Sequence, residues 1–286
     1  MLTLTLLSLS LSAAAQEGPA IALNPAQASP TVVTPAVVTP APGPIPPHQI
    51  FPTAAEALKV VLATNPRILG VGELHSTTSG PAIPTTLSRF TTDIFPVLAP
   101  YTSDLILETW RIDGRCGEVA ETVATQVEVQ TERAPSVKSD LLVLVEAAVA
   151  ADVRPHDLAL TCAEHAGLLD TAGDVQFGPL LSLLTVKLQE FALAAVTTPD
   201  ATMVLYGGAV HNDIYPSADT AKYAYGPAVA KAAGANYVEL DLYQPELVKG
   251  IMLEPEWAGL LALSSPDKVI LYQRGARSWV MLLPKG

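Results

Sequence analysis

The chain has 286 residues, of which 16 are basic and 28 acidic, and its formal net charge at pH 7 is −12. This balance disfavours nucleic acid and anionic membranes as partners, because both require clustered positive charge. Its two cysteines exclude a four-cysteine metal site and permit one disulfide in an exported protein. A small-molecule or peptide substrate is compatible with this composition.

The first 50 residues differ in amino-acid composition from the rest. Residues 1–16, "MLTLTLLSLSLSAAAQ", have the apolar run and small-residue cleavage site of a signal peptide, although basic residues are missing at the start. Residues 17–50 hold nine prolines and no Lys or Arg, which predicts an extended, disordered tether. We therefore expect an exported protein, periplasmic or extracellular, with no transmembrane segment in the mature chain and a single domain at 51–286.

From residue 51 onward, helical and strand-like stretches alternate. In chain order we expect a helix at 52–66, a strand at 67–75, a helix within 84–100, a strand at 104–110, helices near 118–133 and 137–152, a strand at 156–162, a helix at 179–196, a strand at 201–211, a helix within 221–234, a strand at 235–243, short helices in 244–263 and a terminal hairpin at 268–284. Apolar strands alternating with helices predict an α/β three-layer sandwich with a mainly parallel central sheet. The hairpin would add an antiparallel edge.

Polar residues follow nearly every expected strand. In open α/β sheets, ligands bind at the carboxyl ends of the strands, so these residues are candidates for a site. They are Glu73 and His75; Glu108 and Arg111; Cys162, Glu164 and His165; His211, Asn212 and Asp213; and Glu239 and Asp241. The opposite rim receives no comparable set. Imidazoles and carboxylates held together can activate water or bind a divalent metal, and Asp213 or Glu108 could orient a histidine.

Two short motifs carry a resemblance. "GELH" at 72–75 and "GAVH" at 208–211 share the pattern G-x-x-H, and a strand-end glutamate lies between them in "LILETWR". Their glycines allow close backbone approach. This arrangement resembles the superfamily of Tiki/TraB metalloproteases, erythromycin esterases and ChaN-like haem-uptake proteins, in order and spacing of elements over about residues 54–283.

The resemblance implies a site built from Glu73, His75, Glu108 and His211. In Tiki-like members the paired motifs bind a metal, which would make His75, His211 and Glu108 ligands here. In esterase-like members the first motif activates water. ChaN-like members bind haem without catalysis, and in that case Tyr206 or Tyr215 could reach the iron.

The leading hypothesis is an exported hydrolase that cleaves an ester or amide bond, with or without a divalent metal. The alternative is a haem- or iron-binding uptake protein without catalysis, and a third possibility is a degenerate member that only binds a partner. The sequence contains no G-x-S-x-G, G-x-G-x-x-G or Walker A motif, so a serine α/β-hydrolase and nucleotide binding are disfavoured.

Each candidate also has a purely structural interpretation. Glu73 and His75 could form a buried ion pair, and His211 could be a turn residue. Glu108 could pair with Arg111.

Cys162 could be a nucleophile beside Glu164 and His165, unless a disulfide to Cys116 disables it. His156 lies before its strand, at the opposite rim, and is interpreted as structural.

Overall fold

The computed structural model describes residues 45–286 except 79, 113–125, 128–131, 133, 135, 199–201 and 249–255. The described residues belong to one compact unit, Pro40–Gly286. The expected signal segment, the tether as far as residue 44, most of the helix near 118–133 and Cys116 lie outside them. Export and the pairing of Cys116 with Cys162 therefore stay predictions, although the described residues include no free cysteine.

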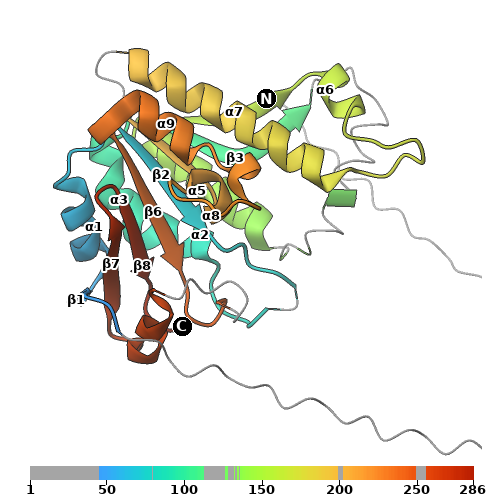
Figure 1. The fold of residues 1–286 in the computed structure, drawn as a ribbon. Coiled ribbons are helices and arrows are strands. Elements are labelled where there is room, and N and C mark those ends of the chain that lie inside the picture. The colour runs from blue at the N-terminus through green and yellow to red at the C-terminus, as the bar shows by residue number, and fades with distance from the viewer. Residues whose placement is uncertain are drawn as a thin grey trace, which may run out of the picture. The chain divides into compact units, whose positions relative to one another are not determined.

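A mixed sheet of eight strands forms the centre of the described unit, in the order β1–β7–β8–β6–β2–β5–β3–β4 (Figure 1). The strands are β1 Gln49–Phe51, β2 Ile68–Glu73, β3 Asp104–Ile112, β4 Arg154–Leu160, β5 Met203–Gly208, β6 Tyr237–Tyr243, β7 Val269–Gly275 and β8 Ser278–Leu282. From β8 to β4 all neighbours are parallel, whereas β7 pairs antiparallel with β8 and β1 with β7. The expected mainly parallel sheet with an antiparallel hairpin at one edge is confirmed.

Helices cover both faces of this sheet, which gives the expected three layers. One face is covered by α1 Ala54–Leu62, α2 Thr86–Arg89, a π-helical turn Phe90–Ile94, α3 Phe95–Leu98 and α5 Ser136–Ala150. The other face is covered by α7 Phe177–Thr197 and α9 Gly226–Ala233. The connections hold the short helices α6 Cys162–Ala166 and α8 Ala209–Asn212 and 3₁₀ turns at Ala99–Tyr101, Ala221–Tyr223, Gly234–Asn236 and Ala258–Leu263.

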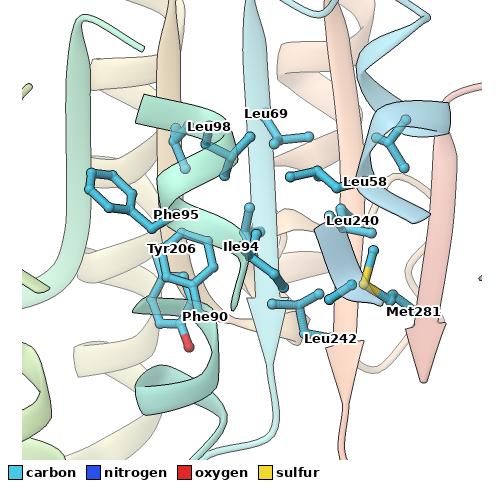
Figure 2. Close-up of a cluster of buried hydrophobic side chains, with 14 of the residues drawn as sticks. Leu58, Leu69, Phe90, Ile94, Phe95, Leu98, Tyr206, Leu240, Leu242 and Met281 are labelled. Carbon is cyan, nitrogen blue, oxygen red and sulfur yellow. The ribbon is translucent and has the colours of Figure 1, made fainter. Parts of the chain in front are cut away.

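Two large hydrophobic cores lie on the two faces of the sheet, and a smaller cluster around Trp257 and Leu260 packs against β7 and β8. Successive strand residues point to opposite faces, so Leu69 and Tyr206 enter one core while Ile68 and Leu205 enter the other. In Figure 2, Tyr206 lies beside Phe90 in the first core, where their ring centroids are 4.4 Å apart and the ring planes are tilted by 40°. Burial of each large apolar side chain contributes about 1.5–3 kcal/mol to the free energy of folding. The two cores therefore hold the strands firmly, and with them the strand ends that carry the polar residues.

Helix α7 is the one described helix that is long and apolar enough to cross a membrane by length and composition. Leu180, Leu184 and Leu188 recur at four-residue intervals and pack into the second core. A core helix has this same pattern. The expectation that the mature chain lacks a transmembrane segment stays a prediction.

Several element boundaries differ from those expected. β1 contains Gln49 and Ile50, which the sequence analysis assigned to the tether, and pairs with Val269–Leu271 of β7. Three residues are too few to show a strand period, and short edge strands are a usual protection against unwanted pairing. β5 ends at Gly208, and α8 carries His211, so this histidine is not a strand residue.

The opposite rim of the sheet carries a polar cluster that the sequence analysis missed. Asp104 at the start of β3 bonds Arg154 at 2.8 Å, His156 at 2.7 Å and Ser103 at 2.8 Å. Burial raises the pKa of the Asp104 carboxyl, but the hydrogen bonds from these three partners outweigh it and hold the pKa below its ordinary value. His156 therefore has the structural role expected of it.

We expect Asp104→Asn to lower the free energy of unfolding at pH 7 by about 1–3 kcal/mol, because it leaves charged partners without their carboxylate. The depressed pKa means that this stabilisation is present above the ordinary pKa of 3.8 and is lost as pH falls through the folded-state value. Urea unfolding between pH 3 and pH 7 checks both points. A variant with the wild-type acid dependence would contradict the assignment.

Deletion of residues 1–44 should leave the unfolding free energy unchanged, because β1 stays in place. Deletion of residues 1–51 removes β1 from β7 and also removes Phe51, which packs against the first core. We expect a loss of about 1–3 kcal/mol from the missing ladder bonds, at about 1 kcal/mol each. Equal urea midpoints for the two truncations would show that β1 contributes nothing.

Candidate functional site

A pocket of about 360 Å³ lies at the carboxyl ends of β2 and β5. It is lined by all four residues of the expected site, Glu73, His75, Glu108 and His211, together with Leu74, Thr77, Gly80, Pro81, Phe177, Leu181, Gly208, Ala209, Val210, Glu246 and Leu247. The sequence-based expectation that these four residues share one rim is thus met by the geometry.

His75 is held by a carboxylate and is the most accessible of the four. Its Nδ1 lies 2.8 Å from Glu73 Oε1, and a carboxylate accepts, so Nδ1 donates. The His75 side chain is 28% exposed and the Glu73 side chain 4%. The other carboxylate oxygen of Glu73 accepts a 2.5 Å hydrogen bond from the hydroxyl of Tyr206. This chain of two hydrogen bonds directs Nε2 of His75 away from Glu73.

Burial, and then the negative charge of Glu73, raise the pKa of the Tyr206 hydroxyl well above its ordinary value. Tyr206 is therefore the protonated partner and donates to Glu73. It lies inside the first core, 4% exposed, and cannot serve as a surface ligand for haem iron. Tyr215 is exposed and stacks under Arg274, and it is not among the residues that line the pocket.

His211 reaches the pocket from α8, directly after β5, and is 2% exposed. Its Nδ1 lies 2.8 Å from the carbonyl oxygen of Tyr223 and 3.0 Å from Thr185 Oγ1. A carbonyl only accepts, so Nδ1 of His211 carries a proton and the lone pair of the neutral ring is on Nε2. The interpretation of His211 as a mere turn residue does not account for this arrangement.

Glu108 connects the two histidines. Its Oε1 lies 3.6 Å from Nε2 of His211, and its Oε2 lies 4.0 Å from Nε2 of His75. The carboxylate also accepts a 2.5 Å hydrogen bond from the backbone N–H of Gly208. Glu108 is 8% exposed and does not pair with Arg111, which bonds Asp157 at 3.1 Å.

Glu108 lies inside β3, where the sequence analysis expected a strand end. β3 pairs with β5 only as far as Leu107, opposite Tyr206, and its register with β4 shifts between Ile106 and Trp110. Irregular pairing of this kind is frequent next to active sites, where it re-aims a side chain. Here it turns the Glu108 carboxylate toward the end of β5.

Glycines let the two G-x-x-H motifs approach each other. A Cβ atom on Gly72 would lie 2.5 Å from Asn212 Oδ1 and 2.6 Å from Ala209 Cα. A Cβ atom on Gly208, the glycine of the second motif, would lie 3.2 Å from His75 Nε2, and one on Gly207, which precedes that motif, would lie 2.5 Å from Glu108 Oε2. Any larger residue would push α8 or Glu108 away, so the expected role of these glycines in close approach is confirmed.

The segment after β5 is anchored to the sheet by buried polar groups. The side-chain amide of Asn212 donates to Gly70 O at 3.2 Å and to Asp241 Oδ1 at 2.9 Å. The backbone carbonyl of Asn212 accepts from the hydroxyl of Tyr237. The backbone N–H of Ile214 donates to Glu239 at 2.8 Å. The sequence analysis placed Glu239 and Asp241 at the site, but they lie within β6 and hold the His211 segment without lining the pocket.

Glu239 belongs to a buried charge cluster with Arg274, which also bonds Asp213 at 2.8 Å. Asp213 therefore orients no histidine. Burial raises the pKa of Glu239 well above its ordinary value, and the nearby charges of Asp241 and Asp213 act in the same direction. The cluster ties the segment after β5 to β6 and β7.

Cys162, Glu164 and His165 do not form the nucleophilic group that was considered. Glu164 caps α6 through Thr161 and bonds Lys187 at 2.7 Å, and that bond holds the pKa of Glu164 below its ordinary value. His165 is fully buried, and neither ring nitrogen has a hydrogen-bond partner among the described residues. Burial lowers the pKa of His165. None of the three lines the pocket.

Sequence reasoning did not find Thr185 or Glu246 and missed the bond from Tyr206 to Glu73. Thr185 is the one polar residue among the buried residues of α7, and a polar residue on a buried helix face is the signal that could have identified it. Glu246 follows β6 and was assigned to short helices. Tyr206 was considered only as packing or as an iron ligand.

The donor set of the site suits a divalent metal chemically. Two imidazoles with Nδ1–H bonded to a carboxylate or carbonyl, and one carboxylate, form the ligand and supporting shell typical of zinc sites. The described residues nonetheless contain no group of three such side chains already gathered in metal-binding geometry.

Tyr206→Phe should disturb the orientation of His75 through Glu73. The variant removes the hydrogen bond to Glu73 and leaves a buried carboxylate oxygen with one donor fewer, which costs about 1–3 kcal/mol of stability. We also expect the NMR signals of the His75 ring to move at a fixed pH, because the ring is bonded to Glu73. Unchanged His75 signals, with only the stability reduced, would limit Tyr206 to packing.

Comparison with known proteins assigns no family. No protein-family model matches the chain, and no curated protein matches it. Among solved structures, the crystal structure of a protein from Bacillus cereus is similar at 14% sequence identity, with a TM-score of 0.37, over 68% of this chain and 72% of that chain. A similarity at this level supports no argument about function.

Proposed function

We propose that the chain is a hydrolase of the erythromycin-esterase/Tiki type, in which His75 activates water to cleave an ester or amide bond. One observation supports this most directly. His75 combines a carboxylate-bonded Nδ1, at 2.8 Å from Glu73, with an accessible ring in a pocket at the strand ends.

The tautomer of His75 suits a general base. Because Nδ1–H donates to Glu73, the neutral ring accepts a proton at Nε2, and the nearby carboxylate stabilises the imidazolium that then forms. Tyr206 restrains Glu73 from the core side. General-base catalysis of this kind contributes about 10²–10⁴-fold in rate.

Glu108 would position the water, with His211 beside it. Oε2 of Glu108 lies 4.0 Å from Nε2 of His75, which exceeds hydrogen-bond length, and both atoms accept, so one water can donate one O–H group to each. Nε2 of His211 lies 3.6 Å from the other oxygen of Glu108. One water proton passes to Nε2 of His75 while the water oxygen attacks the carbonyl carbon. As the tetrahedral intermediate collapses, the same proton moves from His75 to the leaving alcohol or amine.

The pocket volume favours a small substrate or one residue of a larger one. At about 360 Å³ it lies near the lower end of ligand pockets, which span about 300–1,000 Å³. Its apolar lining residues include Leu74, Phe177 and Leu247, which would hold hydrocarbon beside the reacting bond. Export to the periplasm or beyond is part of the proposal and rests on residues 1–16.

The test uses His75→Ala, His211→Ala and the double variant against a panel of small esters and peptides. Each single change should reduce kcat/KM by about 10²-fold or more, and the double change should cost little beyond that, because the groups act as a unit. His156→Ala is the matched control, since it removes a histidine at the opposite rim. It should lose stability and keep activity.

Metal content and a haem titration accompany the kinetics. If a metal copurifies with the wild type and is lost from the His75→Ala variant, the site residues also bind a metal. If each single variant loses little activity and the loss in the double variant is the sum of the two, the histidines do not act on a shared water. A wild type that turns over nothing and shows a haem spectrum would make haem binding the function.

A further inference from the structure

Two different elements hold the ring of His211 through one nitrogen atom. The carbonyl oxygen of Tyr223, in the 3₁₀ turn that follows α8, lies 2.8 Å from Nδ1 of His211. The hydroxyl oxygen of Thr185, on α7, lies 3.0 Å from the same nitrogen. Thr185 is 6% exposed and His211 2%. The carbonyl alone accounts for the hydrogen on Nδ1, so the second oxygen, supplied by another helix, has a further role.

The hydroxyl group of Thr185 has one hydrogen and three polar neighbours. Its oxygen lies 2.7 Å from the carbonyl oxygen of Leu181 and 3.0 Å from the carbonyl oxygen of Tyr223, besides its contact with His211. The two carbonyls only accept, so the hydroxyl hydrogen goes to one of them, and the hydroxyl oxygen accepts from Nδ1 of His211. The Nδ1–H group is thus shared between two oxygens in a bifurcated hydrogen bond.

The backbone of His211 is fixed without Thr185. The carbonyl oxygen of His211 accepts from the backbone N–H of Tyr225 at 2.8 Å, and the next residue, Asn212, bonds Gly70 and Asp241. What these contacts leave open is the rotation of the ring. A single acceptor at Nδ1 allows the ring to pivot about that hydrogen bond, whereas two acceptors from different elements also fix the plane of the ring.

Helix α7 carries a wall of the pocket as well as Thr185. Leu181, whose carbonyl oxygen lies beside the Thr185 hydroxyl, lines the pocket, and so does Phe177 one turn earlier. The turn with Tyr223 lies against the same helix, because a Cβ atom on Gly178 would lie 3.2 Å from the hydroxyl of Tyr223. One helix therefore sets both an apolar wall of the pocket and the orientation of the His211 ring.

We propose that Thr185 is a positioning residue, which fixes the His211 ring so that Nε2 faces Glu108 at 3.6 Å. This inference rests on the proposed hydrolase function, in which His211 lies beside the water that Glu108 positions. Misplacement of a reacting group by about 1 Å costs up to about 10²-fold in rate, so the orientation of the ring affects the reaction even though Thr185 touches no substrate.

The spectroscopic test follows the hydrogen on the His211 ring by NMR, with the signal assigned from its absence in His211→Ala. The wild type should carry a slowly exchanging hydrogen on Nδ1, because this nitrogen is buried and bonded to two oxygens. Thr185→Val keeps the branched side chain and removes the hydroxyl, so the Nδ1–H signal should move. Thr185→Ser keeps the hydroxyl and should keep the signal near its wild-type position.

Two NMR results would overturn the proposal. One is a wild-type His211 ring with a hydrogen on Nε2 alone, and the other is an Nδ1–H signal that stays in place in Thr185→Val. If Thr185→Val does not fold, Thr185→Ser decides, since a folded serine variant that loses the wild-type signal would show that the methyl group and not the hydroxyl holds the ring.

The kinetic test uses hydrolysis of p-nitrophenyl butyrate. Thr185→Val should lower kcat by about tenfold or more, while Thr185→Ser restores most of it. KM should stay within about twofold, because Thr185 makes no contact with the substrate.

Thr102→Val is the matched control. The Thr102 hydroxyl is also buried and also bonds the carbonyl oxygen four residues earlier, that of Leu98 at 2.9 Å, but it lies just before β3 at the opposite rim. Thr102→Val should keep kcat. Equal losses of kcat in the two valine variants would mean that loss of a buried hydroxyl in general sets the effect, and would overturn the role of Thr185.

The two measurements separate this proposal from the hydrolase proposal. If the wild type hydrolyses no ester but the Nδ1–H signal responds to Thr185→Val and not to Thr102→Val, the hydrolase function fails and the positioning of His211 stands. If esters are hydrolysed and both the signal and kcat are unchanged in Thr185→Val, the positioning role fails and the hydrolase function stands.

Discussion

The site depends on the contact between the segment after β5 and the backbone of β2. Asn212 bonds the carbonyl of Gly70 and the carboxylate of Asp241, and only a glycine at position 72 leaves room for this approach. The contact places His211 beside Glu108 and, through it, near His75. The two G-x-x-H motifs are thus parts of one packed unit, in which the glycine of the first motif determines where the histidine of the second lies.

The sequence predicted the parts of this unit that follow from strand topology. Apolar strands alternating with helices predicted the sheet and its layers, and the rule that ligands bind at carboxyl strand ends selected Glu73, His75, Glu108 and His211, all of which line one pocket. That rule acts on a whole strand end, so it also selected residues that serve elsewhere. Asp241 lies in the middle of β6 and anchors Asn212, while Glu164 caps a helix.

What could not be predicted depends on contacts between residues distant in sequence. The bond from Tyr206 to Glu73, the contact of Thr185 with His211 and the cluster of Asp104 with His156 each join two elements whose relative register is set by packing. A polar residue on the buried face of α7 is a local signal for Thr185, but it does not name His211 as the partner, and no local pattern marks the other two contacts. The same holds for β1, whose three residues become a strand only because the edge of β7 accepts them.

The divergence of β3 from β5 has a consequence for how such sites can change over time. The pairing of β3 with β5 ends at Leu107. Beyond it, the backbone N–H of Gly208 donates to the side-chain carboxylate of Glu108, where in a continuing ladder it would donate to a backbone carbonyl of the neighbouring strand. Glu108 therefore completes the hydrogen bonding of the sheet at this point, whatever its role in the pocket. His75 follows the end of β2 and bonds a side chain, so replacing it would leave the ladder intact. Under the proposed hydrolase function, the presence or loss of His75, and not of Glu108, would therefore distinguish an active enzyme from a relative that has kept only the scaffold.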